Sequence, residues 1–184
     1  MMPGLMSRLA IFLRGINVGA HNRIGMADLR ELLDEQGFEG IRTHLQSGNA
    51  VLRAKKSPAV VQRAVSAAIH DRFGLEIEVI ARTAAELAAV VAADPLGSVA
   101  TDPSRHFVAF LSAKPRAALV RALEEDDHGS EQLVVKGREI YVWCPEGLRD
   151  SRVMKTLTPK RLGVAPTVRN WNTVTKVLEL VEGS

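Results

Sequence analysis

Two short segments combine residue types that bind anions. Residues 14–19 read Arg-Gly-Ile-Asn-Val-Gly, and residues 46–49 read Gln-Ser-Gly-Asn. An arginine guanidinium forms charge-assisted hydrogen bonds with phosphate and carboxylate groups. Glycines let the backbone approach a ligand closely and turn its N–H groups toward an anion. The candidate ligand-binding residues here are Arg14, Gly15, Asn17, Gly19, Ser47, Gly48 and Asn49.

A third segment, Arg-Asn-Trp-Asn-Thr at residues 169–173, opens the last helical pattern of the chain. Arg169 and Asn170 join the candidate ligand-binding residues, because a helix N-terminus with an adjacent arginine attracts anions. The structural alternative makes an asparagine of this segment the helix cap and Trp171 the core anchor. The sequence leaves open whether this segment meets the Arg14 loop.

Other site chemistries find little support. The chain has neither the Gly-Lys-Ser/Thr of a P-loop nor the Gly-x-Gly-x-x-Gly of dinucleotide sites. Its five histidines are scattered without metal-ligand spacing, so we expect no metal and no cofactor. Cys144 ends an apolar strand and is expected to be a buried, inert thiol. Ser47 has no evident general base nearby in sequence, so catalytic residues are unknown.

The composition is that of a globular protein, with 46% of the 184 residues hydrophobic. No apolar run approaches the roughly 20 residues of a membrane-spanning helix. The apolar residues 9–13 run directly into Arg14, too short a stretch for a signal peptide. One cysteine cannot form an internal disulfide. We therefore predict a cytoplasmic protein that has no membrane partner.

The formal charge of +3 is mild, but basic residues concentrate near the C-terminus. Between positions 149 and 176 seven Lys and Arg residues stand against the single acid Asp150, and residues 124–127 are all acidic. The simplest interpretation is that both runs lie on solvent-exposed surface. Nucleic-acid binding through residues 149–176 is an alternative, which would depend on backbone contacts and on salt because aromatic residues make up only 4% of the chain.

The elements that must position these residues follow from periodicity. In the first half, strands are expected at 9–13, 41–45, 50–54 and 77–81, and helices at 26–36 and 57–74. Ser57 followed by Pro58 suits a helix start, and Gly74 suits its end. The order is β-α-β-β-α-β, a ferredoxin-like arrangement. Its first two strands run in the same direction, so the loop after the first strand and the 46–49 turn should lie at the same end of the sheet.

The second half is smaller and also α+β. Thr83 and Glu86 have capping-box spacing, a strand is expected at 106–111, a helix at 115–123, and a hairpin at 132–143. Short C-terminal helices complete the chain, the last at about 171–181. The predicted domains are residues 1–82, the ferredoxin-like subdomain, and residues 83–184. The two halves look like related modules, although their sequences match too weakly to be named a repeat.

The motifs of residues 14–19, 26–29, 46–49 and 169–174, in this order, resemble the bacterial domain-of-unknown-function family numbered 1697. The resemblance extends from about residue 8 to residue 180. It implies an α+β chain with a ferredoxin-like half, and it brings no activity, ligand or catalytic residue. Ala20, Val168 and Arg152 depart from the family's usual residues without removing a motif.

Four functions stay open at this point. The first is binding of an anionic, phosphate-bearing small ligand at the loop after the first strand. The second is an enzyme that acts on such a ligand, and the third is the nucleic-acid binder described above. The fourth is a protein–protein interaction module whose motifs line an interface. The sequence does not determine the oligomeric state.

Overall fold

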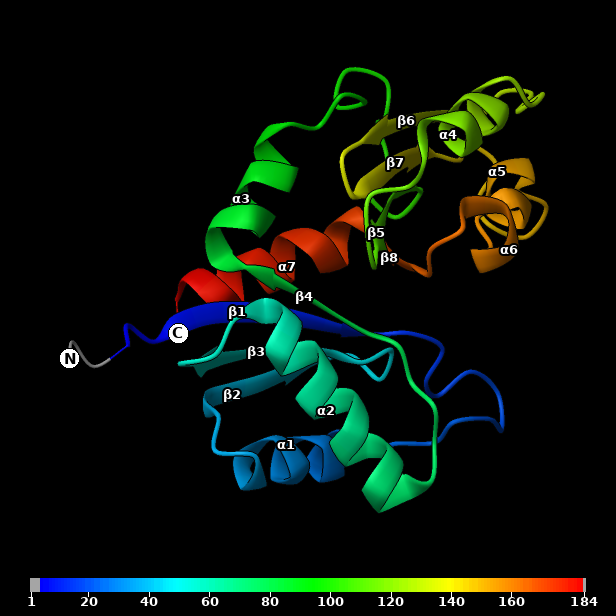
Figure 1. The fold of residues 1–184 in the computed structure, drawn as a ribbon. Coiled ribbons are helices and arrows are strands. Elements are labelled where there is room, and N and C mark those ends of the chain that lie inside the picture. The colour runs from blue at the N-terminus through cyan, green and yellow to red at the C-terminus, as the bar shows by residue number, and fades with distance from the viewer. Residues whose placement is uncertain (1–3, 184) are drawn as a thin grey trace. The chain divides into compact units, whose positions relative to one another are not determined.

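The structure, a computed structural model, describes residues 4–183 and divides into two compact units (Figure 1). The first unit contains the chain up to Ala89 together with the segment from Thr175 onward, and the second contains the chain from Val90 to Val174. Each unit is built on one four-stranded antiparallel sheet. The protein is therefore α+β, as the sequence predicts.

The first unit has the predicted β-α-β-β-α-β order. Its strands lie in the order β2-β3-β1-β4, and each neighbouring pair is antiparallel. This is the ferredoxin-like arrangement, with α1 and α2 on one face of the sheet (Figure 1). The elements are β1 Ser7–Leu13, α1 Met26–Glu35, β2 Glu39–His44, β3 Asn49–Ala54, α2 Pro58–Phe73 and β4 Val79–Thr83.

Local sequence explains these elements. Every second residue of β1, namely Leu9, Ile11 and Leu13, belongs to one buried cluster with the apolar faces of α1 and α2. The Ser57 side chain caps α2 by accepting a hydrogen bond from the Val60 N–H. Gly74 ends α2 in the left-handed conformation that glycine adopts easily. The predicted start and end of this helix are confirmed.

The second unit repeats the strand plan of the first. Its strands lie in the order β6-β7-β5-β8, again antiparallel throughout. Helix α3 (Ala84–Ala92) leads into this unit and α7 (Trp171–Glu182) leads out of it. The other elements are β5 His106–Leu111, α4 Ala117–Glu124, β6 Gln132–Lys136, β7 Glu139–Trp143, α5 Arg152–Thr156, α6 Pro159–Leu162 and β8 Pro166–Asn170.

Strand β8 is the element that the sequence prediction misses, because that prediction assigns only short helices before the last one. The buried side chains of β8 include Thr167 and Arg169, both polar, so the strand lacks an alternating apolar signal. Pro166 at its start is tolerated because β8 is an edge strand. The predicted strand at 77–81 is also displaced, to Val79–Thr83, by its pairing with β1.

The two sheets share a register as well as a strand order. In the first unit Ala10 of β1 pairs with Arg82 of β4, and in the second Val108 of β5 pairs with Arg169 of β8. A helix starts within two residues of each arginine. The second unit thus repeats the plan of the first, with two short helices, α5 and α6, in the place of α2. Among residues 4–183 no helix is long and apolar enough to cross a membrane.

Candidate functional site

The loop after β1 and the turn between β2 and β3 lie together, as the predicted topology requires. We name residues 14–25 and 45–48 the corner. The Leu13 N–H donates to the Gly48 carbonyl at 2.8 Å, and the Asn17 Nδ2 donates to the Gln46 carbonyl at 2.7 Å. The corner therefore unites most of the candidate residues on one end of the first sheet.

Asn17 holds the corner together through its side-chain amide. Besides its bond to the turn, Nδ2 donates to the Ile24 carbonyl at 2.8 Å, and Oδ1 accepts from the Ile24 N–H at 2.9 Å. The amide thus closes its own loop and fastens that loop to the turn. Asn17 therefore stabilises the conformation of the corner.

The turn is equally constrained. Asn49 is fully buried, and its Nδ2 donates to the His44 carbonyl at 2.7 Å and to Ser47 Oγ at 3.0 Å. Gly48 packs so tightly that an added Cβ would lie 2.6 Å from Ile16 Cδ1. Gly48 and Asn49 therefore form the turn from inside, while Ser47 is exposed.

The corner also concentrates unusual backbone conformations. Asn17, Asn22 and Leu45, with φ values of 54°, 49° and 61°, are the non-glycine residues with positive φ in the described chain, 4–183. Asparagine tolerates this conformation, whereas leucine is strained in it. Leu45 is in addition 55% exposed, so core packing does not account for its conformation.

The surface of the corner is cationic and open. Arg14 and Arg23 are exposed there, and Val18 is 65% exposed at the loop tip. Gly15 and Gly19 have positive φ, and no atom lies within 4 Å of a Cβ added to either. The backbone at both glycines is therefore accessible to a ligand.

The start of α1 is already occupied by a carboxylate. Gly25 provides the N-cap without a side-chain hydrogen bond, and Asp28 stands in the first turn. Asp28 Oδ2 lies 3.0 Å from where a Gly25 Cβ would be. The negative charge of Asp28 offsets the helix dipole, so this helix end adds little attraction for an anion.

Arg169 and Asn170 belong to the second unit, whereas the corner belongs to the first. Arg169 lies in β8 and is 9% exposed, and burial lowers the pKa of its guanidinium to about 10, which still leaves it charged at neutral pH. Asn170 caps α7 by accepting a hydrogen bond from the Thr173 N–H at 2.9 Å. The capping role considered for this asparagine is thereby confirmed.

Sequence reasoning misses Arg82, the counterpart of Arg169. Arg82 is only 1% exposed, and its guanidinium donates to the carbonyl of the preceding residue, as that of Arg169 does. Next to Arg82, Thr83 and Glu86 form the predicted capping box, with bonds of 2.8 and 3.1 Å. In both units an arginine is followed directly by a capping residue: Arg82 by Thr83 before α3, and Arg169 by Asn170 before α7.

Comparison with known proteins places the chain in a family. The family model described as "Protein of unknown function (DUF1697)" matches residues 6–141, well over half of the sequence. The chain belongs to this family. The motif at residues 169–174 lies beyond the matched range. No curated protein matches the sequence.

The fold of this DUF1697 chain is similar to that of a solved structure. It is described as a conserved bacterial protein from Streptococcus pneumoniae and is 21% identical in sequence. The match has a TM-score of 0.80 and covers 96% of the present chain and 99% of the other. At this identity the similarity establishes the fold alone.

The second unit of this family member contains a buried histidine, His106. His106 stacks on Trp171 with ring centroids 4.4 Å apart, and its Nε2 lies 3.3 Å from Asp94 Oδ1. Burial lowers the pKa of His106, and the nearby Asp94 carboxylate opposes this in part. The histidine is 2% exposed, which suits a structural role.

The two charge runs noted in the sequence pair with each other. Arg152 lies 2.7 Å from Asp127 and Arg161 lies 2.8 Å from Asp126. Lys176 pairs with Glu179, and Arg169 is buried. Of the seven basic residues, three make no side-chain hydrogen bond or ion pair with any residue among 4–183, namely Arg149, Lys155 and Lys160.

Metal and thiol chemistry find no site in residues 4–183. No three His, Cys, Asp or Glu side chains in that range gather where they could hold a metal ion. Cys144 is buried, and burial raises the pKa of its thiol. Its Sγ lies 3.5 Å from Ser151 Oγ, which in turn donates to Glu131. The expectation of a buried cysteine is confirmed.

Proposed function

We propose that the corner of the first unit binds an anionic, phosphate-bearing small ligand. The observation that carries the proposal is the concentration of left-handed, non-glycine backbone there, above all at the exposed Leu45. Such strained residues persist at ligand sites, where a fixed shape is part of the function. Hydrogen bonds from Asn17 hold this shape in advance, which lowers the entropy lost on binding.

The candidate residues divide between two roles in this proposal. Arg14, Gly15, Gly19 and Ser47 contact the ligand, since they are exposed and combine a guanidinium, open backbone and a hydroxyl. Asn17, Gly48 and Asn49 shape the corner from within. Arg169 and Asn170 belong to the other unit and are not needed. The lone, buried Cys144 supports a cytoplasmic setting for this binding.

A thermal-shift screen tests the proposal. Wild type, Arg14→Gln and Arg63→Gln are heated with nucleotides, sugar phosphates and other phosphorylated metabolites at one ionic strength. Arg63 is an exposed arginine on α2, so its replacement removes the same charge from the same unit. A ligand at about 100 times its Kd adds about 2.7 kcal/mol, which raises Tm by roughly 5–10 °C in a chain of this size.

The expected result is a shift of that size in wild type and Arg63→Gln that is absent in Arg14→Gln. Equal shifts in all three proteins would show that the ligand does not bind at the corner. Loss of the shift in both variants would show that the ligand is held only by general charge attraction. Conversion of the ligand during the assay would make the protein an enzyme that acts at this corner.

A further inference from the structure

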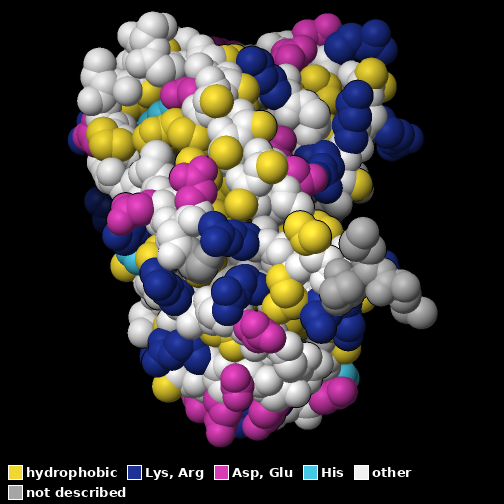
Figure 2. Space-filling view, turned by 90° about the vertical axis from the view of Figure 1, so that its left-hand side faces the viewer, with side chains coloured by type: hydrophobic (Ala, Val, Ile, Leu, Met, Phe, Trp, Pro, Cys, Tyr) yellow, Lys and Arg dark blue, Asp and Glu magenta, His cyan; other side chains and the backbone are white. Residues whose placement is uncertain are grey.

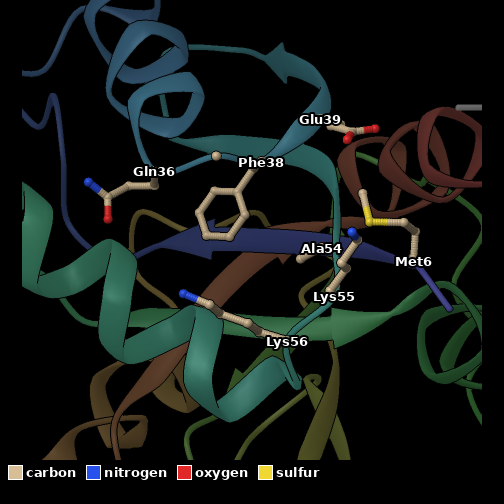
Figure 3. A pocket seen from close by; sticks show the side chains of 8 residues that line it. Met6, Gln36, Phe38, Glu39, Ala54, Lys55 and Lys56 are labelled. Carbon is tan, nitrogen blue, oxygen red and sulfur yellow. The ribbon is translucent and has the colours of Figure 1, made fainter. Parts of the chain in front are cut away.

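A hollow lies on the first unit, away from the residues of the corner. It has a volume of about 220 Å³ and opens where residues 36–39, from the end of α1 to the start of β2, meet residues 54–56, from the end of β3 toward α2 (Figure 3). Its floor contains Phe38 and Ala54, both buried, and Met6 lines one side. Part of the surface of the hollow is therefore apolar, although Phe38 and Ala54 are only 4% and 3% exposed.

Two lysines on the rim have no side-chain partner among residues 4–183. Lys55 and Lys56 are exposed, and neither side chain makes a hydrogen bond or ion pair with any residue of the described chain. The Gln36 side chain is equally without a partner within residues 4–183. The one acid of the rim, Glu39, already faces Arg53 at 3.5 Å. The rim thus has unneutralised positive charge.

A neighbouring hollow, which shares Phe38 and Glu39 with the first, has a different balance of charge and serves as a comparison. Its lining contains two arginines, Arg30 and Arg53, against three acids, Glu31, Asp34 and Glu39. Such a lining gives an anion no net attraction.

The corresponding hollow of the second unit is lined by three acids, Glu131, Glu146 and Asp150, against one arginine, Arg152. It lies between the α4–β6 and β7–α5 connections, the same place in the module. There Glu131 accepts hydrogen bonds from Ser151 and from two backbone N–H groups, and Arg152 pairs with Asp127. Of the three hollows, the one bordered by Lys55 and Lys56 has more basic than acidic side chains in its lining.

We propose that this hollow binds a small organic anion in which an aromatic or apolar group adjoins the negative charge. The lysine ammonium groups receive the anion, while Phe38, Ala54 and Met6 contact the apolar group. A water occupies about 30 Å³, so the hollow has room for roughly seven waters, comparable to one ring with one anionic group. The site does not depend on the proposed function of the corner.

The two lysines border the hollow on different sides of Phe38. Figure 3 shows Lys56 and Gln36 on one side of the Phe38 ring, and Lys55 and Met6 on the other. Lys and Arg side chains are numerous on this face of the first unit, above acidic side chains at the height of α1 (Figure 2). An anion is therefore attracted from solution before it contacts either lysine.

Methyl NMR of the full chain tests the proposal, with phenyl phosphate and inorganic phosphate as probes. The Met6 methyl reports the hollow, and those of Met26 and Met154 serve as internal references. The variants are Lys55→Gln/Lys56→Gln and, as the charge-matched control, Lys155→Gln/Lys160→Gln, whose lysines are exposed in the second unit. Arg14→Gln separates this site from the corner.

We expect phenyl phosphate to shift the Met6 resonance with a Kd at least about tenfold below that of inorganic phosphate, because only the former uses the apolar floor. Lys55→Gln/Lys56→Gln should raise the Kd for phenyl phosphate about tenfold, whereas the control variant and Arg14→Gln should leave it unchanged. The proposal would be overturned if the Met6 methyl resonance did not shift, or if the two probes bound with equal affinity. It would also be overturned if the control variant lost as much affinity for phenyl phosphate as Lys55→Gln/Lys56→Gln does.

Discussion

Asn17 shows how one side chain determines the shape of a surface. Its amide makes three hydrogen bonds to backbone groups, two donated and one accepted, and its own φ is 54°. Asparagine is one of few residues that tolerate this conformation, and it is also able to donate and accept at once. Both properties are needed here, which explains the residue type without any ligand contact.

We expect Asn17→Gly to lower the free energy of unfolding by roughly 2–4 kcal/mol, since glycine keeps the backbone conformation and loses three hydrogen bonds. Asn22→Gly is the matched control, because Asn22 also has positive φ and its amide makes one such bond, to the Gly15 carbonyl. Its cost should be about 1 kcal/mol. Urea denaturation measures both, and equal costs would contradict the cross-linking role of Asn17.

His106 predicts a pH dependence of stability. Its pKa in the folded protein is below the value of 6.5 for an unperturbed histidine, mainly because it is buried. As pH falls below about 6.5 the unfolded chain therefore takes up the proton first, and the folded state loses stability. Above that pH the contribution is fully present.

We expect His106→Phe to remove this part of the loss, because phenylalanine keeps a ring against Trp171 and does not titrate. The measurement compares urea denaturation of wild type and variant at about pH 7.5 and about pH 5.5. The difference in stability between the two pH values should be smaller in the variant. An identical difference in the two proteins would show that His106 is protonated equally in the folded and unfolded chain.

At the scale of elements, the close approach of the β2–β3 turn to β1 sets the geometry of the corner. Gly48 makes this approach feasible, since its φ is 88° and an added Cβ would lie 2.6 Å from Ile16 Cδ1 and 2.9 Å from Leu13 Cβ. Both neighbours are buried core residues that cannot move aside without cost. The glycine is thus required by packing as well as by conformation.

Gly48→Ala should destabilise the protein by roughly 3 kcal/mol or more, through strain in the backbone and overlap with the core. Gly147→Ala provides the comparison, because Gly147 has a similar φ of 85° and no atom within 4 Å of an added Cβ. That substitution should cost only the conformational part, about 1–2 kcal/mol. Equal midpoints of thermal unfolding for the two variants would argue against the close packing of the turn.

At the scale of the whole molecule, the distribution of charge bears on nucleic-acid binding. Within the basic stretch 149–176, Arg152, Arg161 and Lys176 pair with acids, and Arg169 is buried. Arg149, Lys155 and Lys160 remain to contact phosphates. Charge that is neutralised internally releases no counterions on binding. The net charge of +3 adds only weak general attraction.

Binding of a single-stranded oligonucleotide should accordingly be weak, with a slope of log K against log salt of roughly −2, the value for three phosphate contacts. If all seven basic residues took part, the slope would be roughly −5. Fluorescence anisotropy over a range of salt concentrations distinguishes these values. A slope near the larger value would show that the ion pairs open and that the stretch is a nucleic-acid surface.

Much of the fold was predictable because local signals agree with it. The apolar run of β1, the Ser57 cap, the end of α2 at Gly74 and the capping box at Thr83 each have a short-range cause, and together they give the ferredoxin-like order. That order alone predicts that the β1 loop and the β2–β3 turn share one end of the sheet. The adjacency of the corner residues therefore followed from the sequence.

Tertiary structure decided the rest. Strand β8 exists because β5 offers it an edge, although its buried side chains, Thr167 and Arg169, have no apolar pattern to reveal it. The amide of Asn17 joins the loop to the turn because the fold brings two carbonyls within its reach. No acid among residues 4–183 pairs with Lys55 or Lys56, and sequence spacing cannot show whether a distant carboxylate will do so.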